Sequence, residues 1–560
     1  MAYHYESNFS PSEYIKNSVL RSGRICAVGE SPQAMVSRVA YALYKAERRY
    51  VNEQEAKTFA DSIGQLMDAS NIVFSTPIMT NAGRHDFVRP LSACTVPPVS
   101  LSGSWDQIKT MVDAYHAEAM GTGFSFTDVD DPVETLMHLN DIAVKGVLSG
   151  REDRPVGNMG ICHISHPKIA DFVRAKFAHP DIDWKFNVSV DVPETFWESV
   201  LSGDLWRLSN GTKLYSGDLL DLIVSAAHEC ADPGLVYMDR INRDNPIPGA
   251  GAYQSVAPCA EVGLVPGETC QFGYVNLGAL VKGGAFDHEK LIEIVVVLTK
   301  ALDNCLDISQ ESYQVYESRR IVGLRRKIGI GICGLADMFI RLGIPYGSEP
   351  ARVLARDIVA LINLASKKAS HELAVKRGSF EAMSEEYGCE YLDTPTYLER
   401  RYGKEETKWV SPDDWAELGA RIRTTRCMRN STTIALPPTG RSALVIDAST
   451  GVEPLFSLKS ADGSTNKAVQ SVLNKDEKGK DLSVSGLLLT STHIAPMDHL
   501  LMVASLQTVV DDSISKTINL PAESTVGDVK GIYQASHELG LKGITMYREG
   551  TARLQPVKLK

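Results

Sequence analysis

The sequence predicts an α/β fold, in which a helical N-terminal region precedes a large domain of strands and helices. In the first 70 residues, apolar side chains recur at helical spacing, as at Met35, Val39 and Leu43. Residues 186–190 alternate like a half-buried strand, and apolar residues within 291–302 share one helix face. The 560-residue chain is too long for an ordinary single domain, although one large barrel with helical extensions fits.

The composition is that of a globular protein, with 44% hydrophobic and 23% charged residues. The net charge of −11 gives no basic excess for nucleic-acid binding. The N-terminus lacks the pattern of a signal peptide, and no apolar run approaches the roughly 18 residues of a membrane span. The ten cysteines form no CxxC pair, which favours reduced thiols and a cytoplasmic location.

The stretch 255–277 is the strongest candidate for chemistry. Cys259 stands between prolines and glycines with Glu261 two residues later, and Cys270 precedes an apolar run. This pattern predicts a rigid loop that carries Cys259 and Glu261, followed by a strand that begins near Cys270. A carboxylate raises the pKa of a nearby thiol, so hydrogen-atom donation by a neutral thiol fits better than attack by a thiolate. The plainer alternative is a buried structural cysteine beside a surface glutamate.

These residues carry a family resemblance. Pro258-Cys259-x-Glu261, Cys270 and Asn276-Leu277 resemble the finger loop and following strand of ribonucleotide reductases, specifically the adenosylcobalamin-dependent class (class II). Further segments match the family in order along almost the whole chain: 74–83, 91–98, 121–126, 186–190, 233–246, 430–444, 515–521 and 543–548.

The resemblance implies a fold and its divisions. We expect a helical region over residues 1–72, a ten-stranded α/β barrel over 73–550, and a short tail over 551–560. The finger loop at the centre of the barrel would carry the radical cysteine.

The resemblance also implies the catalytic roles. A radical generated from adenosylcobalamin would take the hydrogen atom of Cys259, and the resulting thiyl radical would remove the ribose 3′-hydrogen. Glu261 would deprotonate the 3′-hydroxyl. Cys94 and Cys270 would reduce the sugar as its 2′-hydroxyl leaves, and would become a disulfide. No resident metal ligands are expected.

A second group of residues is expected to bind a ribonucleoside di- or triphosphate. The segment 430–444 resembles the family's phosphate loop, where a Pro/Gly turn, a helix N-terminus, hydroxyl groups and an arginine suit an anion. The expected substrate-binding residues are Thr76, Ser92, Ala257, Asn276, Pro438, Thr439, Gly440, Arg441 and Ser442.

The chain departs from the family at three places. Ala257 stands where relatives have an asparagine that binds the ribose hydroxyls, and the loop after Phe126 is short. No cysteine follows Cys427, so we expect an external thiol reductant such as thioredoxin in place of a C-terminal cysteine pair. The resemblance also favours a homodimer, without nucleic-acid or membrane partners.

Two other motifs have weaker functional interpretations. Cys162, His163 and His166 offer three metal ligands at most, one short of a usual structural zinc site. The sequence 329–334 satisfies GxGxxG, but no Rossmann βαβ context follows it. Three functions remain: a compact reductase, a related radical enzyme acting on a non-standard nucleotide or nucleoside in specialised biosynthesis, and a non-catalytic nucleotide-binding relative.

Overall fold

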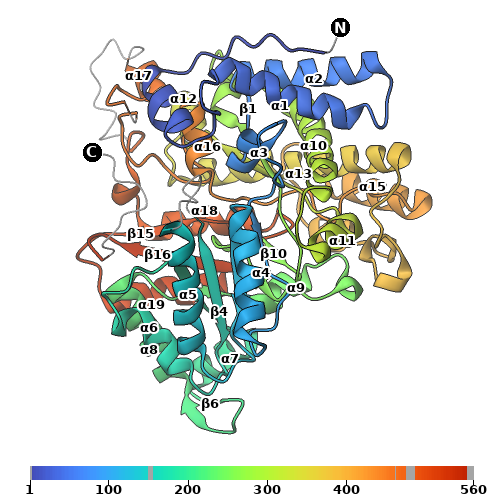
Figure 1. Ribbon diagram of the computed structural model, residues 1–560. Coiled ribbons are helices and arrows are strands. Elements are labelled where there is room, and N and C mark those ends of the chain that lie inside the picture. Colours follow the sequence, from blue (N-terminus) through green and yellow to red (C-terminus); the bar gives the residue numbers. More distant parts are fainter. Residues whose placement is uncertain (1–2, 149–155, 461, 474–485, 552–560) are drawn as a thin grey trace.

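An all-helical layer opens the chain. The computed structural model describes residues 3–148, 156–460, 462–473 and 486–551. A π-helical turn, η1 (Ile15–Arg21), precedes two packed helices, α1 (Pro32–Glu47) and α2 (Glu53–Asp68), which lie side by side at the top of Figure 1. A capping box between Asn52 and Glu55 begins α2. The predicted apolar faces of both helices are buried, which confirms the helical N-terminal region.

Most strands belong to one seven-stranded sheet. Its order is β15-β16-β8-β5-β4-β3-β2. The five strands from β2 to β8 are parallel, whereas β16 is antiparallel to β8 and parallel to β15. The strands are β2 (Cys94–Thr95), β3 (Gly121–Ser125), β4 (Asn158–His163), β5 (Phe186–Asp191), β8 (Gly234–Val236), β15 (Thr517–Leu520) and β16 (Gly543–Arg548).

A three-stranded sheet holds β1 (Ile72–Phe74), β11 (Phe272–Asn276) and β14 (Gly329–Cys333). Strand β11 pairs antiparallel with β1 and parallel with β14. Single parallel bridges extend this sheet from Ile330 to Ile434 and from Leu436 to Ile514. The α/β class is therefore confirmed. Because residues 434–436 and 514 make only isolated bridges, the described residues show no closed ring of ten strands.

Helices cover both sheets (Figure 1). The helices after α2 are α3 (Thr76–Asn81), α4 (Trp105–Ala117), α5 (Pro132–Leu148), α6 (Ile169–Ala178), α7 (Glu194–Ser202), α8 (Ser216–Cys230), α9 (Met238–Arg243), α10 (His288–Gln310), α11 (Tyr316–Arg325), α12 (Leu335–Leu342), α13 (Glu349–Arg377), α14 (Tyr397–Tyr402), α15 (Pro412–Thr425), α16 (Gly440–Val445), α17 (Lys467–Leu473), α18 (Pro496–Gln507) and α19 (Val526–Glu538). The short 3-10 turns are η2 (Pro248–Ala250), η3 (Leu277–Leu280), η4 (Glu385–Tyr387), η5 (Glu390–Leu392) and η6 (Ser491–His493).

Three small antiparallel ribbons complete the fold. They are β6 (Leu205–Arg207) with β7 (Lys213–Tyr215), β9 (Ser255–Val256) with β10 (Gly263–Leu264), and β12 (Val281–Lys282) with β13 (Ala285–Phe286). No helix among the described residues is long and apolar enough to cross a bilayer.

A buried charge cluster joins the helical layer to the rest of the molecule. Asp303 on α10 lies 2.7 Å from Arg326 and 3.1 Å from both Arg377 and Arg429. Arg377 also pairs with Glu47 on α1. Burial alone would raise the pKa of Asp303, but the three guanidinium groups outweigh it and lower that pKa. Asp303 therefore holds together four separate segments of the chain.

We predict that Asp303→Asn lowers Tm strongly, because it leaves three buried arginines without their shared counter-charge. Breaking a buried ion pair from one side costs about 3–5 kcal/mol. Differential scanning calorimetry measures the change. The matched control is Glu417→Gln, which removes the exposed pair with Arg421 and should cost less than about 1 kcal/mol. Equal, small shifts in both variants would contradict the role given to Asp303.

Candidate active site

The segment between β9 and β10 forms a tight loop with a cysteine at its tip. The N–H of Ala260 donates to the carbonyl of Ala257 (2.8 Å), and the N–H of Ala257 donates to Val262 (2.9 Å). Ala260 has a φ of +60°, a left-handed conformation that glycine adopts with less strain. Cys259 is exposed although both of its neighbours in the chain are buried. The loop therefore presents one thiol at its surface.

Two long-range hydrogen bonds fix this loop. The side-chain amide of Asn187 on β5 donates to the carbonyl of Pro258 (2.9 Å), and the N–H of Ser513 donates to the carbonyl of Glu261 (3.0 Å). Strand β3 lies so close that a Cβ at Gly123 would stand 2.1 Å from the carbonyl oxygen of Val256. Glycine at this position is what lets the loop pack against the seven-stranded sheet.

Buried charges hold the base of the loop. The ammonium group of Lys327 donates to the carbonyl of Gly263 (2.8 Å) and lies 3.2 Å from the carboxylate of Asp512. Asp512 adjoins Ser513, the residue that binds Glu261. Burial would lower the pKa of Lys327, but Asp512 and Glu268 outweigh it and raise that pKa, so the side chain stays charged.

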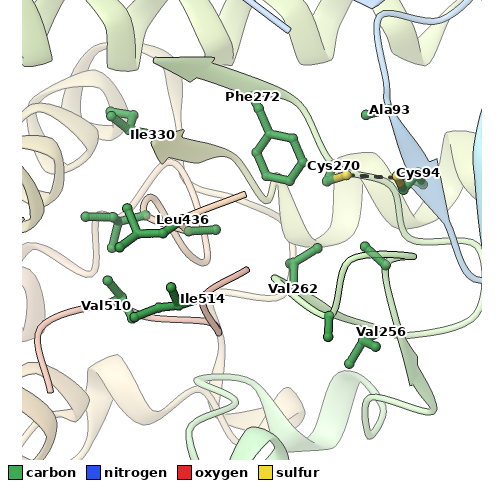
Figure 2. Packing of buried hydrophobic residues seen from close by; sticks show 14 of the residues in the cluster. Ala93, Cys94, Val256, Val262, Cys270, Phe272, Ile330, Leu436, Val510 and Ile514 are labelled. Carbon is green, nitrogen blue, oxygen red and sulfur yellow. Dashed lines mark hydrogen bonds between the residues drawn. The ribbon is translucent and has the colours of Figure 1, made fainter. Parts of the chain in front are cut away.

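Cys94 and Cys270 lie side by side next to the loop (Figure 2). Their strands are joined by backbone hydrogen bonds from Ala93 to Cys270 (3.1 Å) and from Cys270 to Cys94 (3.3 Å). A Cβ at Gly121 would contact both the Cys94 sulfur (3.3 Å) and the ring of Pro258 (2.9 Å). The structure therefore brings the predicted cysteine pair up against the finger loop.

Both thiols of the pair are buried, and Cys270 is strongly disfavoured as a thiolate. Burial raises the pKa of Cys270 well above its usual value, and the neighbouring Cys94 and the carboxylate of Glu261 raise it further. Glu261 is itself buried. The cysteine pair and Glu261 therefore lie together in one buried region beside the loop, where Cys270 keeps its proton at neutral pH.

The expected substrate residues fall into separate places. The hydroxyl of Ser92 lies in an enclosed cluster, where it meets Tyr313 and Thr269 and accepts from Gln271 (2.7 Å). Asn276 stands at the opposite end of β11 from Cys270 and donates to the carbonyl of Ser70 (2.9 Å). Thr76 is half-buried at the start of α3, and Ala257 is fully buried within the loop.

Residues 438–442 form a turn that leads into α16. Gly440 has a φ of +43° and is exposed, as are Pro438 and Arg441. Thr439 is buried, and its hydroxyl accepts from the N–H of Gly451 (2.9 Å). Ser442 is buried as well, with its N–H directed to the carbonyl of Thr439 (2.9 Å). The turn thus exposes Arg441 and the backbone of Gly440, while Thr439 and Ser442 anchor it.

The two weaker motifs have structural roles. The glycines of β14 pack against aromatic rings, since a Cβ at Gly329 would stand 2.5 Å from Phe272. Close packing of β14 against these rings therefore accounts for its glycines. His163 and His166 are engaged in local bonds, such as His166 to the carbonyl of Val129 (2.8 Å). Within the described ranges, no group of three or more His, Cys, Asp or Glu side chains is placed to hold a metal.

The residues that position the loop were not predicted from the sequence. Asn187 lies in a motif matched to the family, but its contact with Pro258 joins residues 71 positions apart. Lys327, Asp512 and Ser513 belong to no motif. Local spacing carries no signal for such long-range contacts.

Comparisons with known proteins agree with this architecture. Residues 126–547 match the model of the ribonucleotide reductase barrel domain, and residues 15–86 match that of its all-alpha domain. The chain is 30% identical to the vitamin B12-dependent ribonucleoside-diphosphate reductase of Mycobacterium tuberculosis (strain CDC 1551 / Oshkosh), over 93% of this chain and 76% of that protein. It is also 30% identical to the reductase of the same name from Thermoplasma acidophilum, over 88% of this chain and 65% of that protein.

A more distant relative covers nearly the whole chain. The vitamin B12-dependent ribonucleotide reductase of Streptomyces coelicolor is 23% identical over 99% of this chain and 66% of its own length. The α/β fold with its helical N-terminal layer is the architecture that both family models describe. The barrel-domain match covers most of the chain, and the chain therefore belongs to the ribonucleotide reductase family.

Proposed function

We propose that this protein reduces the 2′-hydroxyl of ribonucleotides to give 2′-deoxyribonucleotides, in a thiyl-radical reaction that depends on adenosylcobalamin. The observation that carries the proposal is the finger loop, which exposes the thiol of Cys259 at its surface and lies, with the buried Glu261, beside the Cys94–Cys270 pair. The relatives named as vitamin B12-dependent reductases support the same reaction.

The donor set of the site is compatible with adenosylcobalamin. The cobalt of this cofactor is held by its own corrin ring, so the protein needs an accessible thiol rather than a cluster of metal ligands. Of the ten cysteines, all of which lie in the described ranges, only Cys259 is exposed. Gly157 and Asn187 are exposed beside the loop tip and would border the bound cofactor. When bound, the cofactor supplies a carbon–cobalt bond whose homolysis converts a nearby thiol into a thiyl radical.

Each of the four residues of the site then has its own role in the reaction. The Cys259 thiyl radical takes the 3′-hydrogen of the ribose, while Glu261 accepts the proton of the 3′-hydroxyl. The 2′-hydroxyl leaves as water with a proton from the cysteine pair. Cys94 and Cys270 supply two electrons and two protons in total and join in a disulfide, with one proton in the departing water and the other in the new C2′–H bond. Glu261 returns its proton to the 3′-oxygen, and Cys259 returns its hydrogen to C3′. The protonated state of Cys270 suits a residue that must deliver a proton.

The turn at residues 438–442 is the proposed phosphate site. Backbone N–H groups of the turn, the hydroxyls of Thr439 and Ser442 and the exposed guanidinium of Arg441 suit an anion. The relatives from M. tuberculosis and T. acidophilum are named for ribonucleoside diphosphates, which favours a diphosphate substrate here. Thr76, Ser92, Ala257 and Asn276 stay predictions as substrate contacts.

Several finer properties also rest on the family. We infer that the two sheets and the bridging segments 434–436 and 514 correspond to the ten-stranded barrel of relatives, with the loop 257–262 at its centre. The regions 1–72 and 73–550 stay as the proposed division; residues 551–560 fall almost wholly outside the described residues. A thioredoxin-like reductant, a homodimer and a cytoplasmic location stay predictions. The alternative substrate, a non-standard nucleotide or nucleoside, has no support among the relatives.

Anaerobic incubation with adenosylcobalamin, a small dithiol and mixed ribonucleotides should give deoxynucleotides over many turnovers, measured by mass spectrometry. Cys259→Ser removes the hydrogen-atom donor and should abolish the product without lowering Tm, because its side chain is exposed. Deoxynucleotide formation by Cys259→Ser, or no product from the unaltered protein, would overturn the proposal.

Ala257→Asn should raise kcat on ordinary ribonucleotides. The resemblance places there an amide that binds the ribose hydroxyls. A missing hydrogen bond of this kind costs roughly 1–3 kcal/mol, or on the order of 10- to 100-fold in rate. Steady-state kinetics measure the gain, and Tm shows whether the buried position tolerates the larger side chain. A well-folded variant with unchanged or lower kcat would contradict this reading of position 257.

A further inference from the structure

A second polar cavity lies at the far end of β11 from the cysteine pair. Its volume is about 160 Å³, several times what one water molecule needs. It lies among the end of α2, the turn η3, helix α12 and the start of α17. The residues that matter for its chemistry are Ser70, Asn276, Gly278, Asp337, Arg341 and Lys467.

Three polar atoms of this cavity are buried without a hydrogen-bond partner among the described residues. They are Oδ1 of Asp337, Oδ1 of Asn276 and Nε of Arg341. Asp337 is 5% exposed and Asn276 is 7% exposed. Leaving such a group unsatisfied costs roughly 1–3 kcal/mol. Two acceptors and one donor can therefore form hydrogen bonds with a ligand of complementary polarity.

The other half of each side chain is firmly held. Oδ2 of Asp337 accepts from the N–H of Ser449 (2.7 Å), the amide of Asn276 donates to Ser70 (2.9 Å), and Arg341 donates to Gly278 (2.8 Å). The unsatisfied atoms are thus fixed in place.

Apolar packing fixes the positions of the two helices that form the walls of the cavity. Helices α12 and α17 share a small hydrophobic cluster that includes Ala336, Ile340, Ala468 and Val469. The cavity is preformed, so a ligand spends little free energy on ordering it.

The charges around the cavity restrict the ligand. Two carboxylates, Asp337 and Asp447, line it together with the cations Arg341 and Lys467, so the charges balance and favour a neutral group that offers both donors and acceptors. A neutral amino group can donate to Asp337 and Asn276, while a ring nitrogen or carbonyl accepts from Arg341. Lys467 is exposed at the rim, 3.1 Å from Asp447, where it can meet an anion.

We propose that this cavity binds the amino-bearing base of a nucleotide, such as cytosine, with the phosphate directed toward Lys467. The volume suits a single heterocycle, with the sugar and phosphate extending into solvent. This site is separate from the cysteine pair, since the length of β11 lies between Asn276 and Cys270. It does not depend on the proposed reaction, because binding rather than turnover reveals it.

The test compares CMP with UMP, which differ only at two adjacent ring positions: cytosine has a donating 4-amino group and an accepting N3, whereas uracil has an accepting O4 and a donating N3–H. Isothermal titration of the protein at pH 8 measures both affinities, and the alkaline pH favours the ionised form of Asp337, whose pKa burial raises. The unaltered protein should bind CMP about tenfold or more tighter than UMP. Asp337→Asn keeps an acceptor for Ser449 but presents an amide donor to the cavity, so the preference should vanish or reverse.

Two further variants serve as controls. Lys467→Gln should weaken CMP and UMP equally, because it removes only the phosphate contact. Arg441→Ala, in the proposed phosphate turn, should leave the CMP preference unchanged. Equal binding of both probes by the unaltered protein, an unchanged preference in an Asp337→Asn variant of normal Tm, or loss of the preference in Arg441→Ala would overturn the proposal.

Discussion

The structure depends on placing an irregular loop inside the protein. Buried backbone that belongs to no sheet must find hydrogen-bond partners elsewhere, or it costs the desolvation of each polar group. Here the partners come from distant segments: Asn187 binds Pro258, Ser513 binds Glu261, and Lys327 binds Gly263. Together they fix both sides of the loop, and so determine where Cys259 and Glu261 stand.

Buried charges make this loop rigid, although burying them costs free energy. A desolvated ion pair such as Lys327–Asp512 is weak evidence for stability, but it tolerates few alternative geometries. Buried charges also meet around Asp303, where three arginines join α10 to the ends of α11 and α13 and to residue 429, and Arg377 extends the network to Glu47 on α1. We therefore attribute the precision of the site to charge networks that lie outside it.

Much of this could be predicted from the sequence where the signal is local. The apolar spacing of residues 35–43 predicted a helix, and the motif at residues 258–261 predicted a rigid loop. Other outcomes depend on tertiary contacts that no spacing encodes. The position of Asn276, whose contact with substrate stays a prediction, is one example: it lines a cavity at the far end of β11 from Cys270. Likewise, the predicted ten-stranded ring is not closed in regular strands, because residues 434 and 436 form only isolated bridges with their neighbours.

The central claim is that Cys94 and Cys270, held against the finger loop, supply the electrons for reduction. The most direct measurement is a single turnover without any external thiol, followed by disulfide mapping and product quantification on the same sample. The account predicts one deoxynucleotide for each Cys94–Cys270 disulfide formed. Deoxynucleotide formed while both thiols stay reduced, or a disulfide at other cysteines in equal amount, would contradict it.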